Sequence, residues 1–148
     1  MSQIRNAVLC ALVPIFVVLV LGIGTRAGRQ HFPVIASLAV VFCLLGLILV
    51  VLTSRLTESR WRKTLFLLAG GSAAGIPVSA VMHNLVYGLF IRWFGRGVWG
   101  PNGDEPVFFI LAIFVFPALF VVSSAASVIL IFKAGIPKNK NDDNGVRL

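Results

Sequence analysis

Four long stretches of this chain contain no charged side chain. Asp, Glu, Lys and Arg are absent from residues 6–25, 32–54, 64–91 and 106–132. A helix needs roughly 20 apolar residues to cross the hydrocarbon core of a bilayer, and inside that core the backbone polar groups must pair within the helix. Buried helices of a soluble bundle would show polar faces, which these stretches lack. The sequence therefore predicts an all-α integral membrane protein, a bundle of four transmembrane helices.

The predicted organisation is a single transmembrane domain, residues 1–132, followed by a polar tail. We expect the four helices at about 7–24, 32–52, 64–91 and 106–132. The tail, residues 133–148, contains no aromatic side chain, so we expect it to be disordered and solvated. Hydrophobic residues make up 58% of the chain and charged residues 12%, a balance that a soluble core does not explain.

The basic residues that give the chain its net charge of +8 lie between the apolar stretches and do not form one face. One side of the predicted membrane receives Arg5, Arg55, Arg60, Arg62, Lys63, Lys133, Lys138, Lys140 and Arg147, and the other receives Arg26, Arg29, Arg92 and Arg96. The basic excess marks the cytoplasmic side, which places both termini inside the cell at the plasma membrane. The basic residues around Trp61 are expected to contact anionic lipid headgroups. No aromatic–basic binding motif accompanies the charge, so a nucleic-acid partner is not expected.

Residues that begin helices are recognisable at three of the polar connections. Pro33 suits the first turn of the second helix. Thr57 is predicted to be the N-cap of the third helix, with Glu58 in its first turn. Asp104 or Glu105 is predicted to cap the fourth helix, which Pro106 begins.

Small residues four positions apart predict how two of the helices pack. They are Gly71, Gly75 and Ser79 in the third stretch and Ser123 and Ser127 in the fourth. Such rows allow close helix approach. We expect Gly71 to face Ser127 and Gly75 to face Ser123, with Leu119 over Ser79. A homodimer seam along the glycines is the alternative. The second helix is almost uniformly aliphatic, so it is expected to face lipid over most of its circumference.

The polar residues with a possible chemical role are His83, Asn84 and Tyr87 at the end of the third stretch, and Asp104 and Glu105 before the fourth. One interpretation is that they cap helices and form hydrogen bonds near the membrane surface. The alternative joins His83 and the two carboxylates with His31 in a metal or proton-handling site. No ligand spacing such as His-x-x-x-His supports a metal, so neither a metal nor a cofactor is predicted.

Three classes of function remain open. The first, which we favour, is a non-enzymatic accessory or structural membrane subunit that packs against itself or against a membrane-protein partner. The second is a small oligomeric channel or permease whose path would be lined by Ser72, Ser79 and His83. The third is a membrane enzyme with an outer-surface site near His83. No acidic residue lies inside a span, which argues against a proton-coupled exporter, and no familiar catalytic motif occurs.

Overall fold

The protein is described by a computed structural model that covers residues 2–26, 30–99, 103 and 105–135. The long helices are α1 (Ser2–Gly24), α3 (Phe32–Ser54) and α4 (Arg60–Phe94), and the 3₁₀ turn η1 (Arg96–Trp99) follows α4. The last helical run consists of α5 (Pro106–Ile110), the π turn η2 (Leu111–Val115) and α6 (Phe116–Gly135). Within the residues covered there is helix and no strand.

Four of these helical runs are long and apolar enough to cross a membrane: Ser2–Gly24, Phe32–Ser54, Arg60–Phe94 and Pro106–Lys133. The all-helical prediction is thus confirmed. α1 and α4 begin several residues earlier than predicted, because an uncharged stretch marks only the part of a helix suited to hydrocarbon. Arg and Lys favour helix, so the backbone stays helical where charged side chains begin.

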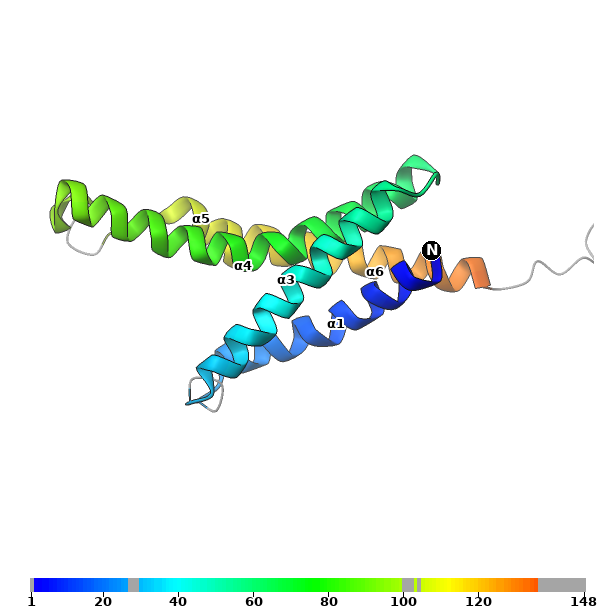
Figure 1. Ribbon diagram of the computed structural model, residues 1–148, viewed down its shortest axis with the longest axis horizontal. Helices are drawn as coiled ribbons and strands as arrows, with labels where there is room; N and C mark the ends of the chain where they lie inside the picture. Colours follow the sequence, from blue (N-terminus) through cyan, green and yellow to red (C-terminus); the bar gives the residue numbers. More distant parts are fainter. Residues whose placement is uncertain (1, 27–29, 100–102, 104, 136–148) are drawn as a thin grey trace, which may run out of the picture.

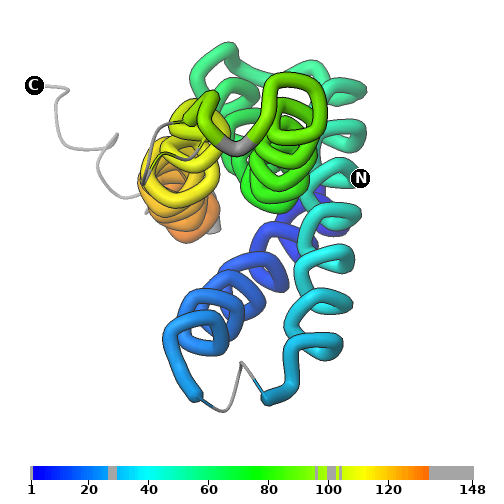
Figure 2. Tube along the Cα trace, turned by 90° about the vertical axis from the view of Figure 1, so that its left-hand side faces the viewer, coloured from blue at the N-terminus to red at the C-terminus, as the bar shows by residue number. Residues whose placement is uncertain are grey.

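The helices gather at one end of the molecule and separate toward the other (Figure 1). The N-terminus, the connection between α3 and α4, and the end of α6 lie at the end that we call the terminal end. At the opposite end, called the loop end, the α1–α3 hairpin diverges from α4 and α5. Figure 2 shows the same separation from the side, with α1 and α3 extending away from α4 and α6.

α3 and α4 touch through their backbones at two glycines. A Cβ on Gly46 would lie 2.8 Å from the carbonyl oxygen of Gly70 and 2.9 Å from the backbone nitrogen of Ala74. A Cβ on Gly70 would in turn lie 2.8 Å from the carbonyl oxygen of Gly46. Only hydrogen atoms fit at this crossing. α3 is therefore anchored on α4 along one side, although many of its other aliphatic side chains are exposed.

Three phenylalanines connect the remaining helices at the centre of the molecule. The Phe16 ring of α1 lies 4.8 Å from the Phe120 ring of α6, and Phe120 lies 5.4 Å from the Phe42 ring of α3, between ring centroids. These distances suit tilted and edge-to-face aromatic contacts. Leucines and alanines surround them in the core: Leu9, Leu12, Leu19, Leu49, Ala69 and Ala73, together with Phe66.

The predicted register between the third and fourth helices is wrong. A Cβ on Gly71 would meet nothing within 4 Å, whereas the three atoms nearest to one on Gly75 would all belong to the Phe116 ring, at 3.0 Å. Leu119 is 39% exposed. Phe116 and Ser123 are seven residues apart, which is about two turns of an α-helix. The observed and predicted neighbours of Gly75 therefore lie on nearly the same face of the helix but at different levels along it.

Ser79, Ser123 and Ser127 are nevertheless buried, as small residues in a helix interface would be. The hydroxyl of Ser123 donates to the carbonyl oxygen of Leu119 in its own helix. Internal hydrogen bonds of this kind satisfy a hydroxyl without a partner helix.

The helix starts follow the predictions in two of three cases. Pro33 lies in the first turn of α3, and Pro106 begins α5 with Glu105 as its N-cap. The third prediction is wrong, because Ser59 and not Thr57 is the N-cap of α4. Glu58 therefore precedes the helix, where it is free to contact α1.

Candidate functional site

Glu105 holds the start of the fourth helical run. Its side chain is only 3% exposed. Oε1 accepts a hydrogen bond from the backbone nitrogen of Val107 at 2.8 Å, and Oε2 accepts one from that of Phe108 at 2.9 Å. The first N–H groups of a helix have no partner within the helix, and they form the positive end of its dipole. A buried carboxylate is therefore well stabilised at this position.

His83 of α4 contacts the same residue. Its Nδ1 lies 3.1 Å from the backbone carbonyl oxygen of Glu105 and 3.3 Å from Oε2. Both are oxygen acceptors, so Nδ1 carries a proton and donates it. This contact ties α4 to the residue that caps α5. Two of the candidate residues, His83 and Glu105, thus lie together, in a pairing that fixes one helix to the next.

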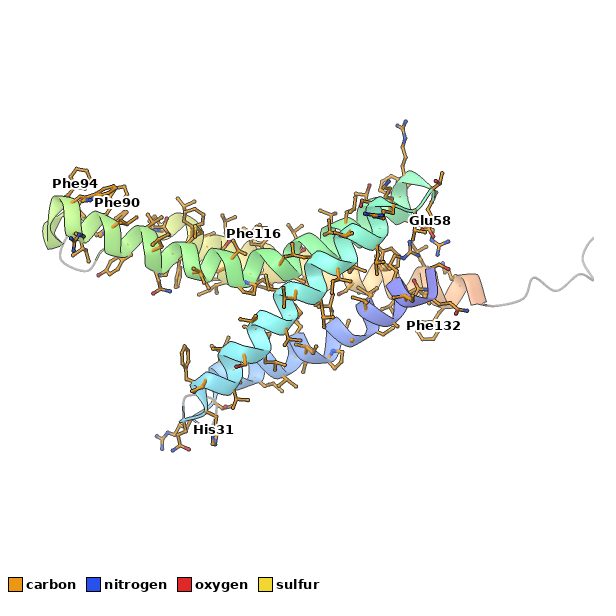
Figure 3. All side chains as sticks on the ribbon, in the orientation of Figure 1. His31, Glu58, Phe90, Phe94, Phe116 and Phe132 are labelled. Atoms are coloured by element: carbon orange, nitrogen blue, oxygen red, sulfur yellow. The ribbon has the colours of Figure 1, made fainter. Side chains whose placement is uncertain are left out.

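Aromatic rings cover this pair on the α4 side. The Tyr87 ring lies 6.5 Å from the His83 ring and 6.5 Å from the ring of Trp99, between centroids. Trp99, in η1, also packs on Phe90 at 5.1 Å. Phe90 and Phe94 mark this end of α4 in Figure 3. The turn after α4 thus folds back on the helix through aromatic contacts.

The remaining candidates are not part of this pair. The Asn84 side chain is exposed and donates to the carbonyl oxygen of Ala80 at 2.8 Å. His31 lies at the tip of the α1–α3 hairpin, away from the end of α4 that carries Phe90 and Phe94 (Figure 3). Asp104 lies outside the described residues. Among the residues that are described, no group of three His, Cys, Asp or Glu side chains could hold a metal ion.

A second polar cluster, which no local sequence pattern indicates, lies at the terminal end. Arg5 of α1 is 1% exposed. Its Nη1 lies 2.7 Å from Oε2 of Glu58, and its guanidinium lies 3.9 Å above the centre of the Phe66 ring in α4. A cation over an aromatic face is attracted by the ring electrons. Arg5 therefore joins α1 to both α4 and the connection before it.

The charge of Arg5 also acts on its partner. The hydrogen bond from Arg5 is the largest influence on the Glu58 carboxyl, and it holds the pKa of Glu58 below the ordinary value of 4.5. Arg62 adds a weaker attraction, with its Nε 3.9 Å from Glu58 Oε2. Sequence reasoning counted these residues only as charges and caps, because nothing local relates Arg5 to a residue 53 positions away.

Comparison with known proteins brings no further information on either cluster. No protein-family model, curated protein or solved structure matches the chain.

In both clusters the polar groups join helices of one chain. Glu105 accepts backbone hydrogen bonds at the start of α5, and His83 donates to it from α4. Arg5 and Glu58 link α1 to the start of α4. Polar contacts of this kind position helices relative to one another.

Proposed function

We propose that the chain is a non-enzymatic multi-pass subunit of the plasma membrane that works by packing its helices against a membrane-protein partner. Four helices that could cross a membrane support the location. The role is supported by the use of the main polar residues in internal contacts, while the outer faces of the helices stay apolar.

The observation that carries the proposal is the separation of the two helix pairs. α1 and α3 leave α4 and α5 beyond the crossing at Gly46 and Gly70 (Figure 1). Exposed apolar side chains occur on every spanning helix, among them Val18, Val41, Val81 and Val122. A four-helix chain that spreads in this way presents more lateral surface than a closed bundle, and lateral surface is where membrane helices associate.

The polar residues that would have to line a pore make hydrogen bonds within the chain or are buried. Ser72 and Ser79 are buried, and the Ser72 hydroxyl donates to the carbonyl oxygen of Leu68 in its own helix. His83 donates to Glu105. Residues engaged in this way favour the packing role over the channel or permease alternative.

The proposal is tested by cross-linking the tagged full-length protein in its native membrane, purifying it in mild detergent and identifying what accompanies it by mass spectrometry. We expect one defined membrane protein in near-stoichiometric amount. A variant of the chain with Val122→Lys, on the exposed face of α6, is the matched control. A charge inside hydrocarbon is unfavourable by roughly 3 kcal/mol, so this control also requires a check that the variant reaches the membrane.

A homo-oligomer with no second protein would contradict the accessory role and favour the pore. Flux through vesicles, measured with and without His83→Ala, would then be the next measurement. A monomer with no partner would contradict both, and would leave the surface around His83 as the place to look for activity.

A further inference from the structure

Two neighbouring helical runs are interrupted at the same level. In α4, Pro77 has no backbone N–H, so the carbonyl group four residues earlier loses its helical partner. In the last helical run, the π turn η2 is followed directly by Phe116 and Pro117. The Phe116 ring would lie 3.0 Å from a Cβ on Gly75, and Gly75 is two residues before Pro77. The two interruptions therefore lie beside each other.

Interruptions of this kind are where helices bend. Sharp changes in helix direction occur almost always at prolines, at small residues or at π turns, and π turns are frequent at functional sites. α4 changes direction part-way along its length (Figure 1). Because both helical runs are interrupted beside each other, they can bend there together.

The segments on the loop side of these interruptions are tied to one another. We call the described residues from 78 to 110 the loop-end unit, which consists of the end of α4, η1 and α5. His83 of α4 donates to the backbone carbonyl oxygen of Glu105 at 3.1 Å, and its ring lies 5.6 Å from the Phe109 ring of α5. Trp99 of η1 packs on Phe90 of α4 at 5.1 Å. These contacts join the three parts into one body.

The loop-end unit has little hold on the rest of the molecule. α4 contributes Phe66, Ala69 and Ala73 to the hydrophobic core, and all three precede Pro77. None of the described residues of the unit belongs to that core, and only Ser79 and Glu105 among them are buried. A segment with few buried apolar contacts moves most readily. The unit is attached mainly through the two interrupted helices.

α3 leaves room beside the unit. Between α3 and α4 lies an apolar groove whose lining includes Val40, Cys43, Leu44, Pro77, Val78 and Val81. Val78 and Val81, the first residues of the unit on this side, are at least half exposed. Pro77 itself lies in the wall of the groove, so a bend at this residue changes the distance between α3 and the unit.

We infer that Pro77 and η2 form one hinge, about which the loop-end unit swings as a single body relative to α3 and α6. The swing widens or narrows the groove and changes the lateral surface that α4 and α5 present. The inference does not depend on the proposed partner, because every contact that carries it lies within one chain.

The test is double electron–electron resonance, which measures the distribution of distances between two spin labels. It uses the full-length protein in phosphatidylcholine nanodiscs, with the native cysteines replaced by alanine and labels at pairs of introduced cysteines. The pair at Val51 and Leu85 crosses the hinge, the pair at Val51 and Val122 lies on its terminal side, and the pair at Leu85 and Val107 lies within the unit. All four native side chains are at least half exposed. We expect the distribution across the hinge to be at least about twice as wide as the other two.

Pro77→Ala supplies the missing N–H to one of the two helices. Because both helices have to bend together, we expect the distribution across the hinge to narrow to the width of the other two. Pro14→Ala is the matched control and should change nothing. Pro14 also lies inside a helix, but α1 contributes core residues on both sides of it, among them Leu12 and Leu19.

Equal widths for all three pairs in the unmodified protein would overturn the inference, because the unit would then be fixed. A wide distribution that survives Pro77→Ala, or an equal effect of Pro14→Ala, would overturn it by placing the motion elsewhere. A pair within the unit as wide as the pair across the hinge would show that the unit is not one body. If Pro77→Ala fails to accumulate, the three widths in the unmodified protein still decide whether the unit swings.

Discussion

Arg5 shows how a single charged side chain can be built into a largely apolar molecule. Removing a charge from water is unfavourable unless a partner and hydrogen bonds replace the water. The two Nη atoms of Arg5 find such partners in the Glu58 carboxylate at 2.7 Å and the Asn6 side-chain oxygen at 3.3 Å, and the guanidinium lies over the ring of Phe66. Its buried Nε has no hydrogen-bond partner among the described residues. Loss of the Glu58 carboxylate would leave the buried guanidinium without its charged partner. The Arg5–Glu58 pair should therefore contribute more to the stability of the fold than an exposed ion pair does.

Glu58→Gln should lower the stability of the folded protein and make that stability depend less on pH. Arg5 holds the folded-state pKa of Glu58 below 4.5. The stabilisation is therefore present above the unfolded-state pKa and is lost as the pH falls through the lowered folded-state pKa. At neutral pH we expect a loss of about 2 kcal/mol, as for a hydrogen bond to a charged group. Thermal unfolding in detergent between pH 7 and pH 3 measures both effects.

Arg62→Gln is the matched control for this measurement. Its Nε lies 3.9 Å from the same carboxylate oxygen, so we expect a loss of well under 1 kcal/mol, as for other exposed pairs. Equal losses for the two variants, or an unchanged pH dependence in Glu58→Gln, would show that the Arg5–Glu58 contact does not stabilise the fold.

At the scale of the elements, the packing of α3 on α4 depends on two glycines that no spacing rule selects. Gly46 is the only glycine in α3, and Gly70 lies beside the Gly71–Gly75 pair rather than in it. A lone glycine gives no row to recognise, so the sequence pointed to the neighbouring pair instead. The long uncharged stretches, by contrast, predicted four spans because length and apolarity depend on no partner.

Gly46→Ala should destabilise the protein, and Gly71→Ala should not. The new methyl group at Gly46 would lie less than 3 Å from backbone atoms of α4, which cannot move as a side chain can, so we expect a loss of about 2 kcal/mol or more. At Gly71 there is open space, and alanine favours helix over glycine by about 1 kcal/mol. Melting temperatures in detergent compare the two.

Size-exclusion chromatography with light scattering completes this comparison. If Gly71→Ala lowered both the melting temperature and the molecular mass of the particle in solution, the glycine row would form a seam between two chains. A melting temperature of Gly46→Ala equal to that of the unmodified protein would contradict the backbone contact at the crossing.

The candidate site was predictable to a similar, partial extent. Glu105 as a cap and Pro106 as a first residue follow from local chemistry, and His83 stood out as a polar residue in an apolar run. Their contact did not follow, because it joins residues 22 positions apart on two different helices. The π turn Leu111–Val115 was also unpredictable, since its apolar residues suit an α-helix equally well.

At the scale of the whole molecule, three segments that carry basic residues lie at the same end. The terminal end brings together the N-terminus, the connection 55–59 and the end of α6 (Figure 1). These are the segments that carry Arg5, Arg55 and Lys133. An even number of spans brings both termini to one side, and a basic excess favours the cytoplasm.

An orientation with the terminal end in the cytoplasm predicts opposite labelling of two introduced cysteines. In a chain with Cys10 and Cys43 replaced by alanine, Val98→Cys in η1 should react with a membrane-impermeant maleimide in intact cells. Arg55→Cys, between α3 and α4, should react only after lysis. Both native side chains are exposed, so neither position is shielded by the fold. The reverse pattern would invert the topology, and labelling of both in intact cells would exclude a four-span arrangement.

The glycine crossing also divides α4 into two arms of unequal length. From Gly70, α4 extends roughly 15 Å back to Arg60 and roughly 36 Å on to Phe94, at 1.5 Å per residue. The short side is fastened by Arg5 and Glu58, whereas the long side ends at Phe94. A rotation of about 10° at the crossing would move that distant end by about 6 Å. Small displacements at the fastened side of the crossing are thus magnified at the far end of α4.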